Sequence, residues 1–277
     1  MRRRKYQFDE AKVQKYVAEG RGSGDGAYYN PWLKITDLPS RGRSHRVFGI
    51  KTGRVHHLLS DGEWKCFLRF EADPTVVDIR EQLPLDRLQT YAIARELGYR
   101  PPITTDGTPY VLTIDFLITR RMGDSFQLEP YSFKYKTEKL TDRQHQLHRI
   151  AEECTRRNGL TLKRLDESFF DERLIRNYDA IRSFFDISSH ADYEPSKLRR
   201  QSSALLDVVA NPGNHTLGSA CREVAKACDT TPQAVLRTAK HLLARGVLVS
   251  DHLSKSADLP DMELTDIRIG RKDPPTW

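Results

Sequence analysis

Two carboxylates and a pair of lysines are the residues whose types and spacing indicate chemistry in this chain. Glu63 opens a predicted helix, Asp115 lies in the apolar run 113–117, and Lys134 and Lys136 follow on the next predicted strand. Two carboxylates can hold a magnesium ion against a phosphate and leave room for water in its octahedral shell. Such an ion polarises the phosphate and lowers the pKa of the attacking water, while a nearby lysine stabilises the developing charge. The pattern therefore predicts metal-dependent phosphodiester hydrolysis.

The position of Asp115 strengthens this interpretation. An acid followed by a lysine on the neighbouring strand is common in proteins and is a weak signal alone. Asp115, however, stands between Ile114 and Phe116, and burying an unpaired carboxylate is costly. The competing interpretation is a structural ion pair between Asp115 and Lys134. Because side chains alternate along a strand, Ser132 and the two lysines would share one face of theirs.

The surrounding sequence predicts the elements that position these residues. Apolar residues at helical spacing, preceded by Ser60 or Asp61 as a cap, predict the helix that begins near Glu63. Alternating and β-branched runs predict strands. We expect helices at 8–19, 62–73, 86–98 and 140–159, strands at 45–49, 54–58, 76–85, 111–120, 130–136 and 160–167, and an extended piece at 32–35. This order describes an α/β fold in which helices flank a mixed sheet.

The character of the chain changes after residue 167. We expect helices at 171–185 and 197–210, a helix–turn–helix at 218–246 and the start of a wing at 247–251. The sequence therefore predicts two domains. Residues 1–167 would form the α/β domain, and residues 168–277 an α-rich, winged-helix-like domain that binds a partner or DNA.

The second helix of the helix–turn–helix carries Arg237, Lys240, His241 and Arg245. In a DNA reader this helix would enter the major groove. It also carries an apolar stripe, which any packed helix requires, and winged-helix modules bind proteins as well. Between these alternatives, the sequence favours partner binding with accessory DNA contact.

Composition excludes several classes of protein. The chain has 277 residues, of which 38% are hydrophobic and 30% charged. No run of 18 apolar residues occurs, so no membrane span is expected, and the basic N-terminus lacks the apolar core of a secretory signal. We therefore expect a cytoplasmic protein with reduced thiols. The four cysteines, none in a CxxC pair, are Cys66, Cys154, Cys221 and Cys228.

Positive charge is concentrated near the N-terminus. Residues 1–54 hold 13 lysines and arginines against five acids, whereas the whole chain has a net charge of +7. Such a segment suits a phosphate backbone, because cations that neutralise phosphates release counterions. Four arginines are the candidate DNA contacts: Arg41, Arg43, Arg46 and Arg54. The alternatives are a solvated basic tail and ion pairs with acids that follow Glu71.

Other polar residues near the predicted site have a structural alternative. His56 and His57 are adjacent in a strand and point to opposite faces, so a structural or DNA-facing role is favoured over joint metal binding. Asp78 and Glu81 could support the site from behind the ligands, or form ion pairs with Arg80 or Arg87.

Several ordered motifs resemble one known family. SRGRSHRV, KTGRVHHLLSDGE, VVDIREQLPL and TIDFL occur in this order over residues 40–117. This part of the chain resembles the N-terminal half of the TnsA endonucleases. The likeness runs from about residue 19 to 167, with a looser match in the C-terminal half.

The resemblance implies a restriction-endonuclease-like fold with a Mg²⁺ site, at which Mn²⁺ would also act. Glu63, in SDGE, matches the family's helix glutamate, and Asp115, in TIDFL, matches its metal-binding aspartate. The family's lysine falls on Lys134 or Lys136, and the register of the next strand favours Lys134. Ser132 then stands where the family has glutamine or an acid. The implied catalytic residues are Glu63, Asp115 and Lys134, and the implied metal ligands are Glu63, Asp115 and Ser132.

The resemblance also implies a reaction and partners. Family members cut the 5′ ends of a transposon, on the non-transferred strand of double-stranded DNA, while a TnsB-like DDE transposase cuts the 3′ ends. They contact a TnsC-like AAA+ ATPase, largely through the C-terminal domain. The departure at Ser132 keeps a second hypothesis open, a catalytically weakened assembly factor that bridges transposase, ATPase and DNA. Without the resemblance, a two-domain transcription regulator with a basic arm would be the third.

Overall fold

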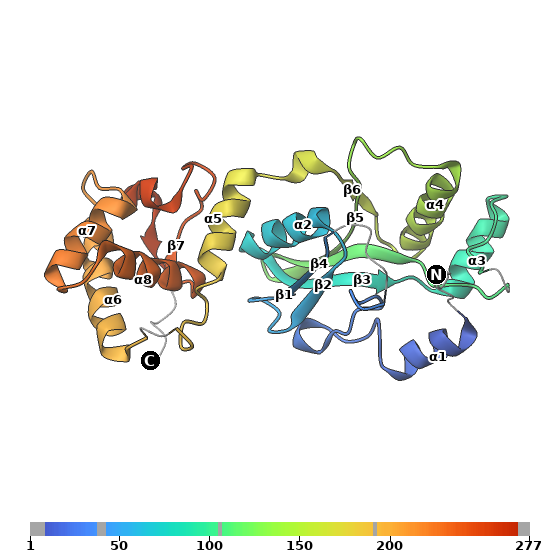
Figure 1. Cartoon of the computed structure of the whole chain (residues 1–277). Coiled ribbons are helices and arrows are strands. Elements are labelled where there is room, and N and C mark those ends of the chain that lie inside the picture. Colours follow the sequence, from blue (N-terminus) through green and yellow to red (C-terminus); the bar gives the residue numbers. More distant parts are fainter. Residues whose placement is uncertain (1–8, 38–42, 105–106, 191–192, 271–277) are drawn as a thin grey trace, which may run out of the picture. The chain divides into compact units, whose positions relative to one another are not determined.

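Four strands form the central sheet of the first part of the chain (Figure 1). In spatial order they are β3 (Val76–Pro84), β4 (Thr113–Met122), β5 (Ser125–Phe133) and β6 (Lys163–Leu165). β3, β4 and β5 are antiparallel neighbours, whereas β6 runs parallel to β5. The sheet is therefore mixed, as the sequence predicted, although β6 is shorter than the expected strand at 160–167.

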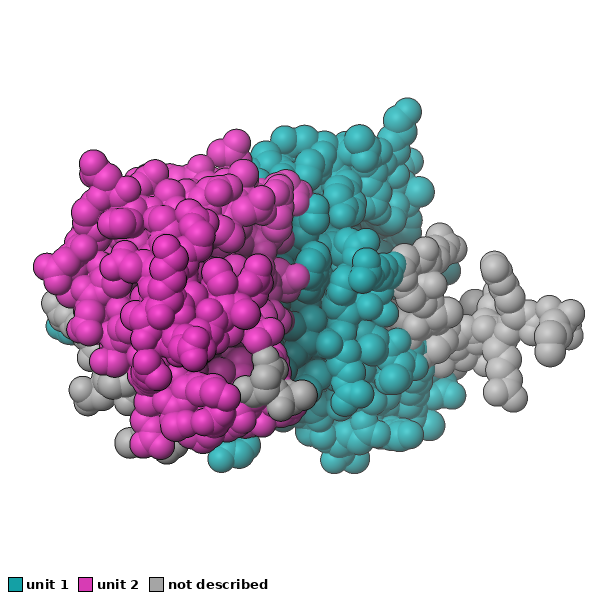
Figure 2. Space-filling model, turned by 60° about the vertical axis from the view of Figure 1, so that its left-hand side comes forward, with its two compact units in different colours: residues 1–170 teal, residues 171–277 magenta. Residues whose placement is uncertain are grey.

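The computed structural model describes residues 9–37, 43–104, 107–190 and 193–270. The chain divides into two compact units, residues 1–170 and 171–277 (Figure 2). The first unit thus includes the 3-10 helix η2 (Glu167–Phe169), which follows the boundary expected from the sequence. Within the described residues, no helix is long and apolar enough to cross a membrane.

The β4–β5 hairpin differs from the expected strand at 130–136. Gly123 has a φ of +63° in its turn, a conformation that glycine adopts without strain. Pairing with β4 extends β5 back to this turn, and the strand ends at Phe133. Beyond it, the Lys134 N–H donates to a carbonyl of β6 at 3.0 Å. Lys134 and Lys136 therefore lie past the strand, and the expectation that both lie on it is wrong.

Three helices pack around this sheet. They are α2 (Asp61–Ala72), α3 (Arg87–Glu96) and α4 (Asp142–Arg157). In α2, the Phe70 ring lies 5.6 Å from that of Phe116 in β4. α3 and α4 lie side by side (Figure 1), and their Ile93 and Ile150 share a buried cluster with Ile114 of β4. The apolar residues that flank Asp115 thus hold β4 against helices from different parts of the sequence.

The N-terminal segment adds α1 (Glu10–Ala18), the 3-10 helix η1 (Gly26–Tyr28) and an antiparallel hairpin of β1 (His45–Phe48) and β2 (Val55–Leu58). The extended piece expected at 32–35 is instead a turn. The Asp37 carboxylate accepts a hydrogen bond from the Lys34 N–H at 2.8 Å and also binds Arg21. The bond to the Lys34 N–H satisfies that backbone group locally, while the Trp32 N–H donates to the Gln82 carbonyl of β3 at 3.3 Å.

Helices dominate the second unit. They are α5 (Glu172–Arg182), α6 (Pro195–Ala210), α7 (Leu217–Ala227) and α8 (Pro232–Ala244). Strands β7 (Leu248–Val249) and β8 (Arg268–Ile269) pair with each other. The chain between them forms two 3-10 helices, η3 (Leu259–Asp261) and η4 (Leu264–Asp266). Thr231 caps α8 by accepting a hydrogen bond from the Ala234 N–H at 3.2 Å. The C-terminal region is thus helical with one small sheet, and its winged-helix assignment stays a prediction.

Candidate functional site

Glu63 is held at the start of α2 by the cap of that helix. Ser60 Oγ accepts a hydrogen bond from the Glu63 N–H at 3.1 Å and donates to Glu63 Oε1 at 3.2 Å. Glu63 Oε2 accepts from the Leu59 N–H at 2.9 Å. This arrangement resembles a capping box, in which the third helical residue reaches back to the cap. It fixes a carboxylate that is only 8% exposed.

Asp115 is held by the hairpin partner of its strand. The register pairs Phe116 with Tyr131, so one further step along the strands brings Asp115 opposite Ser132. There the Asp115 Oδ2 accepts a hydrogen bond from the Phe133 N–H at 2.7 Å. At the end of β5 the Phe133 N–H thus donates to the Asp115 side chain and not to a backbone carbonyl of β4. This bond fixes the Asp115 carboxylate beside the end of β5.

The two carboxylates perturb each other. Burial and the nearby charge of Asp115 raise the pKa of Glu63 to about 8, against an ordinary value of 4.5. Burial also raises the pKa of Asp115, and the charge of Lys134 is the strongest influence in the opposite direction. Two desolvated carboxylates close together favour a shared proton or a cation. The site is therefore short of positive charge, even with Lys134 beside it.

Gln82 connects the two acids and was not foreseen from the sequence. It lies inside β3 with a φ of +50°, an uncommon conformation for a residue other than glycine. Its buried amide Nε2 donates to Glu63 Oε2 at 3.4 Å, and it also donates to Asp115, which lowers the pKa of that carboxyl. Thr113 Oγ1 donates to Gln82 Oε1 at 2.9 Å and fixes the orientation of the amide. The only signal in the sequence was a polar residue within an otherwise strand-like run.

Ser132 and His148 form a second polar connection at the site. Ser132 is buried at the end of β5, and its Oγ lies 3.0 Å from Nε2 of His148 on α4. A protonated His148 would lower the pKa of Asp115 through its charge, which places the imidazole near the carboxylates. Sequence reasoning missed His148, although its position beside Leu147 and two residues before the buried Ile150 marks it as a residue bordering the apolar face of its helix.

The two candidate lysines have different environments. Lys134 is partly buried, and its charge lowers the pKa of both Asp115 and Glu63. Lys136 is exposed, and its Nζ lies 3.4 Å from Asp166. The geometry thus groups Lys134 with the carboxylates and leaves Lys136 in a surface ion pair.

The donor set suits a hard, oxygen-seeking cation. Among the described residues, no group of three or more histidine, cysteine, aspartate or glutamate side chains is arranged to hold a metal ion. Mg²⁺, however, is commonly held by one or two carboxylates, with water and substrate oxygens as its other ligands. Glu63 supplies a buried carboxylate and Asp115 a half-buried one, with the charge of Lys134 nearby, and the Ser132 hydroxyl supplies a neutral oxygen. These residues fit Mg²⁺ or Mn²⁺ better than a structural zinc ion, which prefers a closed set of nitrogen and sulfur ligands.

The four arginines proposed as DNA contacts lie in different environments. Arg41 falls outside the described residues, whereas Arg43 and Arg46 are exposed, beside and within β1. Arg54 is buried, and its guanidinium donates to both carboxylate oxygens of Glu81 at 2.9 and 2.6 Å. The ion-pair alternative therefore describes Arg54, which is not accessible to a phosphate in this structure.

Glu81 is the centre of a buried network that joins the β1–β2 hairpin to β3. Besides the two bonds from Arg54, it binds His56 Nδ1 at 2.7 Å and accepts from the His57 N–H at 3.0 Å. Burial alone would raise the pKa of Glu81, but His56 and Arg54 hold it at about 2. His56 therefore has a structural role, and Glu81 pairs with these residues and not with Arg80 or Arg87.

For Asp78 the ion-pair interpretation is confirmed, because its carboxylate lies 3.2 Å from Arg80 Nε.

Basic residues of α8 and of its C-cap, Arg245, contact their own unit. His241 is buried, with its Nδ1 2.7 Å from the Phe184 carbonyl oxygen. Lys240 lies over the Phe184 ring and Arg245 over the Phe185 ring, at 5.0 and 4.6 Å from their centroids. These contacts weaken the case for α8 as a reader of DNA bases.

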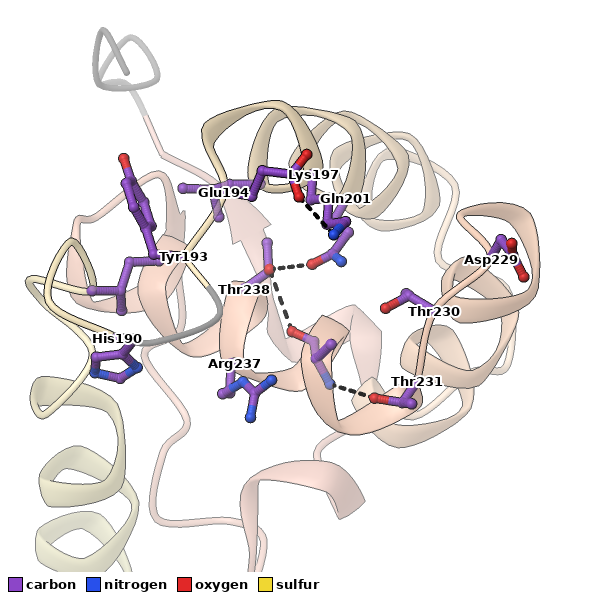
Figure 3. Close-up of a pocket in the computed structure, with 13 residues that line it drawn as sticks. His190, Tyr193, Glu194, Lys197, Gln201, Asp229, Thr230, Thr231, Arg237 and Thr238 are labelled. Carbon is purple, nitrogen blue, oxygen red and sulfur yellow. Dashed lines mark hydrogen bonds and ion pairs between the residues drawn. The ribbon is translucent and has the colours of Figure 1, made fainter.

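A pocket of about 330 Å³ opens in the second unit and includes Arg237 of α8 (Figure 3). It is lined by polar residues of α6 and α8, and Thr238 Oγ1 donates to Gln201 Oε1 across it at 2.6 Å. All of its described lining residues belong to the second unit.

The chain is similar in sequence to a known transposition protein. The chain is 31% identical over 257 residues to the transposon Tn7 transposition protein TnsA of Escherichia coli. The match covers 91% of this chain and 92% of that protein. No family model matches the chain. The similarity thus extends over both compact units.

The buried Arg54–Glu81 pair provides a prediction about stability. Arg54→Ala leaves the Glu81 carboxylate buried without the guanidinium that binds both of its oxygens, so we expect a loss of about 3–5 kcal/mol in the free energy of unfolding. Arg46→Ala, in the same hairpin but exposed, should change it by about 0.5 kcal/mol or less. Urea denaturation of both variants measures this difference. Equal stability of the two would show that the network contributes little.

The carboxylate pair provides a second prediction. In metal-free protein, the folded state binds more protons than the unfolded state between the ordinary pKa of Glu63, 4.5, and its raised value of about 8. Stability conferred by this group therefore falls as the pH rises through that window. Asp115→Asn removes one of the two charges while its amide oxygen can still accept from Phe133, so we expect a higher Tm at pH 8, by about 2–4 °C per kcal/mol of repulsion relieved.

Thermal unfolding in EDTA and in Mn²⁺ tests this second prediction. Mn²⁺ should raise the Tm of the wild type more than that of Asp115→Asn, because the ion replaces the missing positive charge. Asp124→Asn, in the exposed β4–β5 turn, is the matched control and should behave as the wild type. A lower Tm of Asp115→Asn in EDTA would contradict the expected repulsion.

Proposed function

The chain belongs to the TnsA family of transposition proteins, and we propose that it is a metal-dependent DNA endonuclease that cuts the 5′ ends of a transposon, on the non-transferred strand. The observation that carries this proposal is the meeting of buried Glu63 and half-buried Asp115, two carboxylates whose pKa values are raised, beside Lys134. Such a cluster has little structural value without a cation, whereas phosphodiester hydrolysis uses each of its parts.

The proposed fold of the first unit is restriction-endonuclease-like. An acid at the start of a helix, a second acid in a central strand and a lysine just past the hairpin partner of that strand support this assignment. The mixed four-stranded sheet with helices around it is compatible with it. The proposed functional domains are the catalytic domain, residues 1–167, and a winged-helix-like domain, residues 168–277.

In the proposed mechanism, Glu63, Asp115 and the Ser132 hydroxyl hold Mg²⁺, and Mn²⁺ can take its place. The bound ion would neutralise charge on the scissile phosphate and favour ionisation of the attacking water. Lys134 stabilises the negative charge that develops on the phosphate. Gln82 and the Ser60 cap keep both carboxylates in position, so that little reorganisation is needed when DNA binds.

The proposed partners follow from the family. A TnsB-like DDE transposase would cut the 3′ ends, and a TnsC-like AAA+ ATPase would contact the second unit. The internal contacts of α8 favour protein binding over base recognition for that unit. For double-stranded DNA at the transposon ends, exposed Arg43 and Arg46 are the proposed phosphate contacts in the described residues, with Arg41 as a further candidate.

Ser132 is the reason for a second candidate function, that of an assembly factor without cleavage activity. Ser132 is a weaker ligand than the glutamine or acid that stands at this position in the family. A site with low affinity for metal would leave an assembly factor that bridges transposase, ATPase and DNA without cutting. The two hypotheses differ in a single measurable property, cleavage that depends on Asp115.

Strand-specific cleavage of transposon-end DNA is the test. The wild type and Asp115→Ala are compared in Mg²⁺ or Mn²⁺, each with the matching transposase and ATPase present. We expect the wild type to cut the 5′ ends and Asp115→Ala to leave only 3′ nicks, because the variant lacks one of the two carboxylates. The 3′ nicks serve as the internal control for active partners.

The two lysines provide matched variants in the same assay. Lys134→Ala should lower the rate of 5′ cleavage at least about a hundredfold, as loss of a residue that stabilises the developing charge does. Lys136→Ala should cleave nearly as the wild type does. The reverse order would assign the catalytic role to Lys136, and 3′ nicks alone from the wild type would support the assembly factor.

A further inference from the structure

We propose that His148 and Glu152 make the Ser132 hydroxyl an effective metal ligand, by accepting its proton in a hydrogen bond and turning its oxygen toward the carboxylates. The inference rests on the proposed function and deepens it, because it explains how a serine can complete the site. It assigns His148 and Glu152 as positioning residues, since neither would touch the metal or the DNA itself.

The first step is the direction of the hydrogen bonds. His148 Nδ1 lies 3.1 Å from Glu152 Oε1, one turn further along α4. A carboxylate accepts hydrogen bonds, so Nδ1 carries the proton that points at Glu152. On a ring that carries its proton on Nδ1 alone, Nε2 is an acceptor, and the Ser132 hydroxyl, 3.0 Å away, would donate to it. The chain of bonds therefore runs from Ser132 through His148 to Glu152.

The second step is the effect on the serine oxygen. A hydroxyl that donates its proton to imidazole keeps its lone pairs for another partner and carries more negative charge on oxygen. Because Ser132 is buried and lies opposite Asp115 across the hairpin, that other partner would be the ion held by the carboxylates. The same logic applies to residues behind the ligands in many metal sites, where a carboxylate or imidazole orients the group that binds.

The third step distinguishes this role from direct ligation by His148. No described group of three or more histidine, cysteine or carboxylate side chains could hold a metal, so His148 is not placed as a third partner to Glu63 and Asp115. Around the imidazole lie Ser132 from β5, Asp115 from β4, and Glu152 on its own helix. Arg149 Nη1 binds the other oxygen of Glu152 at 3.0 Å and steadies that carboxylate.

Mn²⁺ binding to the full chain, measured from the free Mn²⁺ signal in electron paramagnetic resonance, tests the inference without using cleavage. His148→Ala should weaken binding about 10–100-fold, the usual loss when a residue behind a metal ligand is removed. His145→Ala, on the exposed side of the same helix, should bind as the wild type does. Glu152→Gln should weaken binding by less than His148→Ala, because its amide oxygen can still accept from Nδ1.

A second pair of variants separates the proposed role from a purely structural one. Ser132→Asp supplies a charged ligand that needs no help from imidazole. In that background, the added His148→Ala should change Mn²⁺ affinity by about twofold or less. A tie between α4 and β5 that served only the fold would instead lower the Tm in both backgrounds and leave Mn²⁺ affinity unchanged. Thermal unfolding of each variant confirms that the proteins compared are folded.

The remaining outcomes each have one meaning. Wild-type affinity in His148→Ala, or an equal loss of affinity in the Ser132→Asp background, overturns the inference and leaves the nuclease proposal intact. Nitrogen coupled directly to bound Mn²⁺, and lost in His148→Ala, overturns it in favour of direct ligation. Binding by Ser132→Asp but not by the wild type overturns it as well, because serine is then no ligand. If neither protein binds Mn²⁺, the proposed metal-dependent function fails too.

Discussion

The burial of two carboxylates in one place is the constraint on which the first unit depends. Glu63 and Asp115 come from a helix and a strand that are far apart in the sequence, and burial raises the pKa of both. Charge repulsion would separate them unless other contacts held each one. The fold supplies those contacts from the backbone, because the Leu59 and Phe133 N–H groups each donate to one carboxylate. The unit thus keeps a concentration of negative charge that a bound proton or a cation relieves.

Strain and capping are both used to maintain this arrangement. Gln82 adopts a left-handed conformation in the middle of a strand, which costs on the order of 1 kcal/mol or more. Its amide interacts with both acids in this conformation. The Ser60 cap serves two purposes, since it starts α2 and fixes the carboxylate of Glu63. Features that look local in the sequence are therefore parts of one site.

The sequence predicted those parts that depend on local patterns. The helix at Glu63 and the strand around Asp115 follow from capping and apolar spacing, and the structure brings the two candidate carboxylates close enough for the charge of Asp115 to raise the pKa of Glu63. The end of β5 was misplaced, because pairing with β4 sets its limits and the sequence near Lys134 alone does not. Gln82 and His148 were missed for the same reason. A residue becomes part of a site through tertiary contacts, which polar character in a strand or helix does not reveal.

The charge of the N-terminal segment also depends on tertiary contacts that the sequence does not reveal. These contacts connect the β1–β2 hairpin to the helix that carries Glu63. Basic residues counted from the sequence include Arg54, whose charge is used inside the unit by Glu81. The number of basic side chains that DNA could reach is therefore smaller than the number counted in the sequence. In β1 the exposed basic residue is Arg46. The neighbouring His45 binds Asp61 Oδ1 at 2.6 Å and stacks on Trp64, both in the first turn of α2. Since Glu63 lies between these two residues, a phosphate held by the hairpin would be positioned relative to the carboxylate itself.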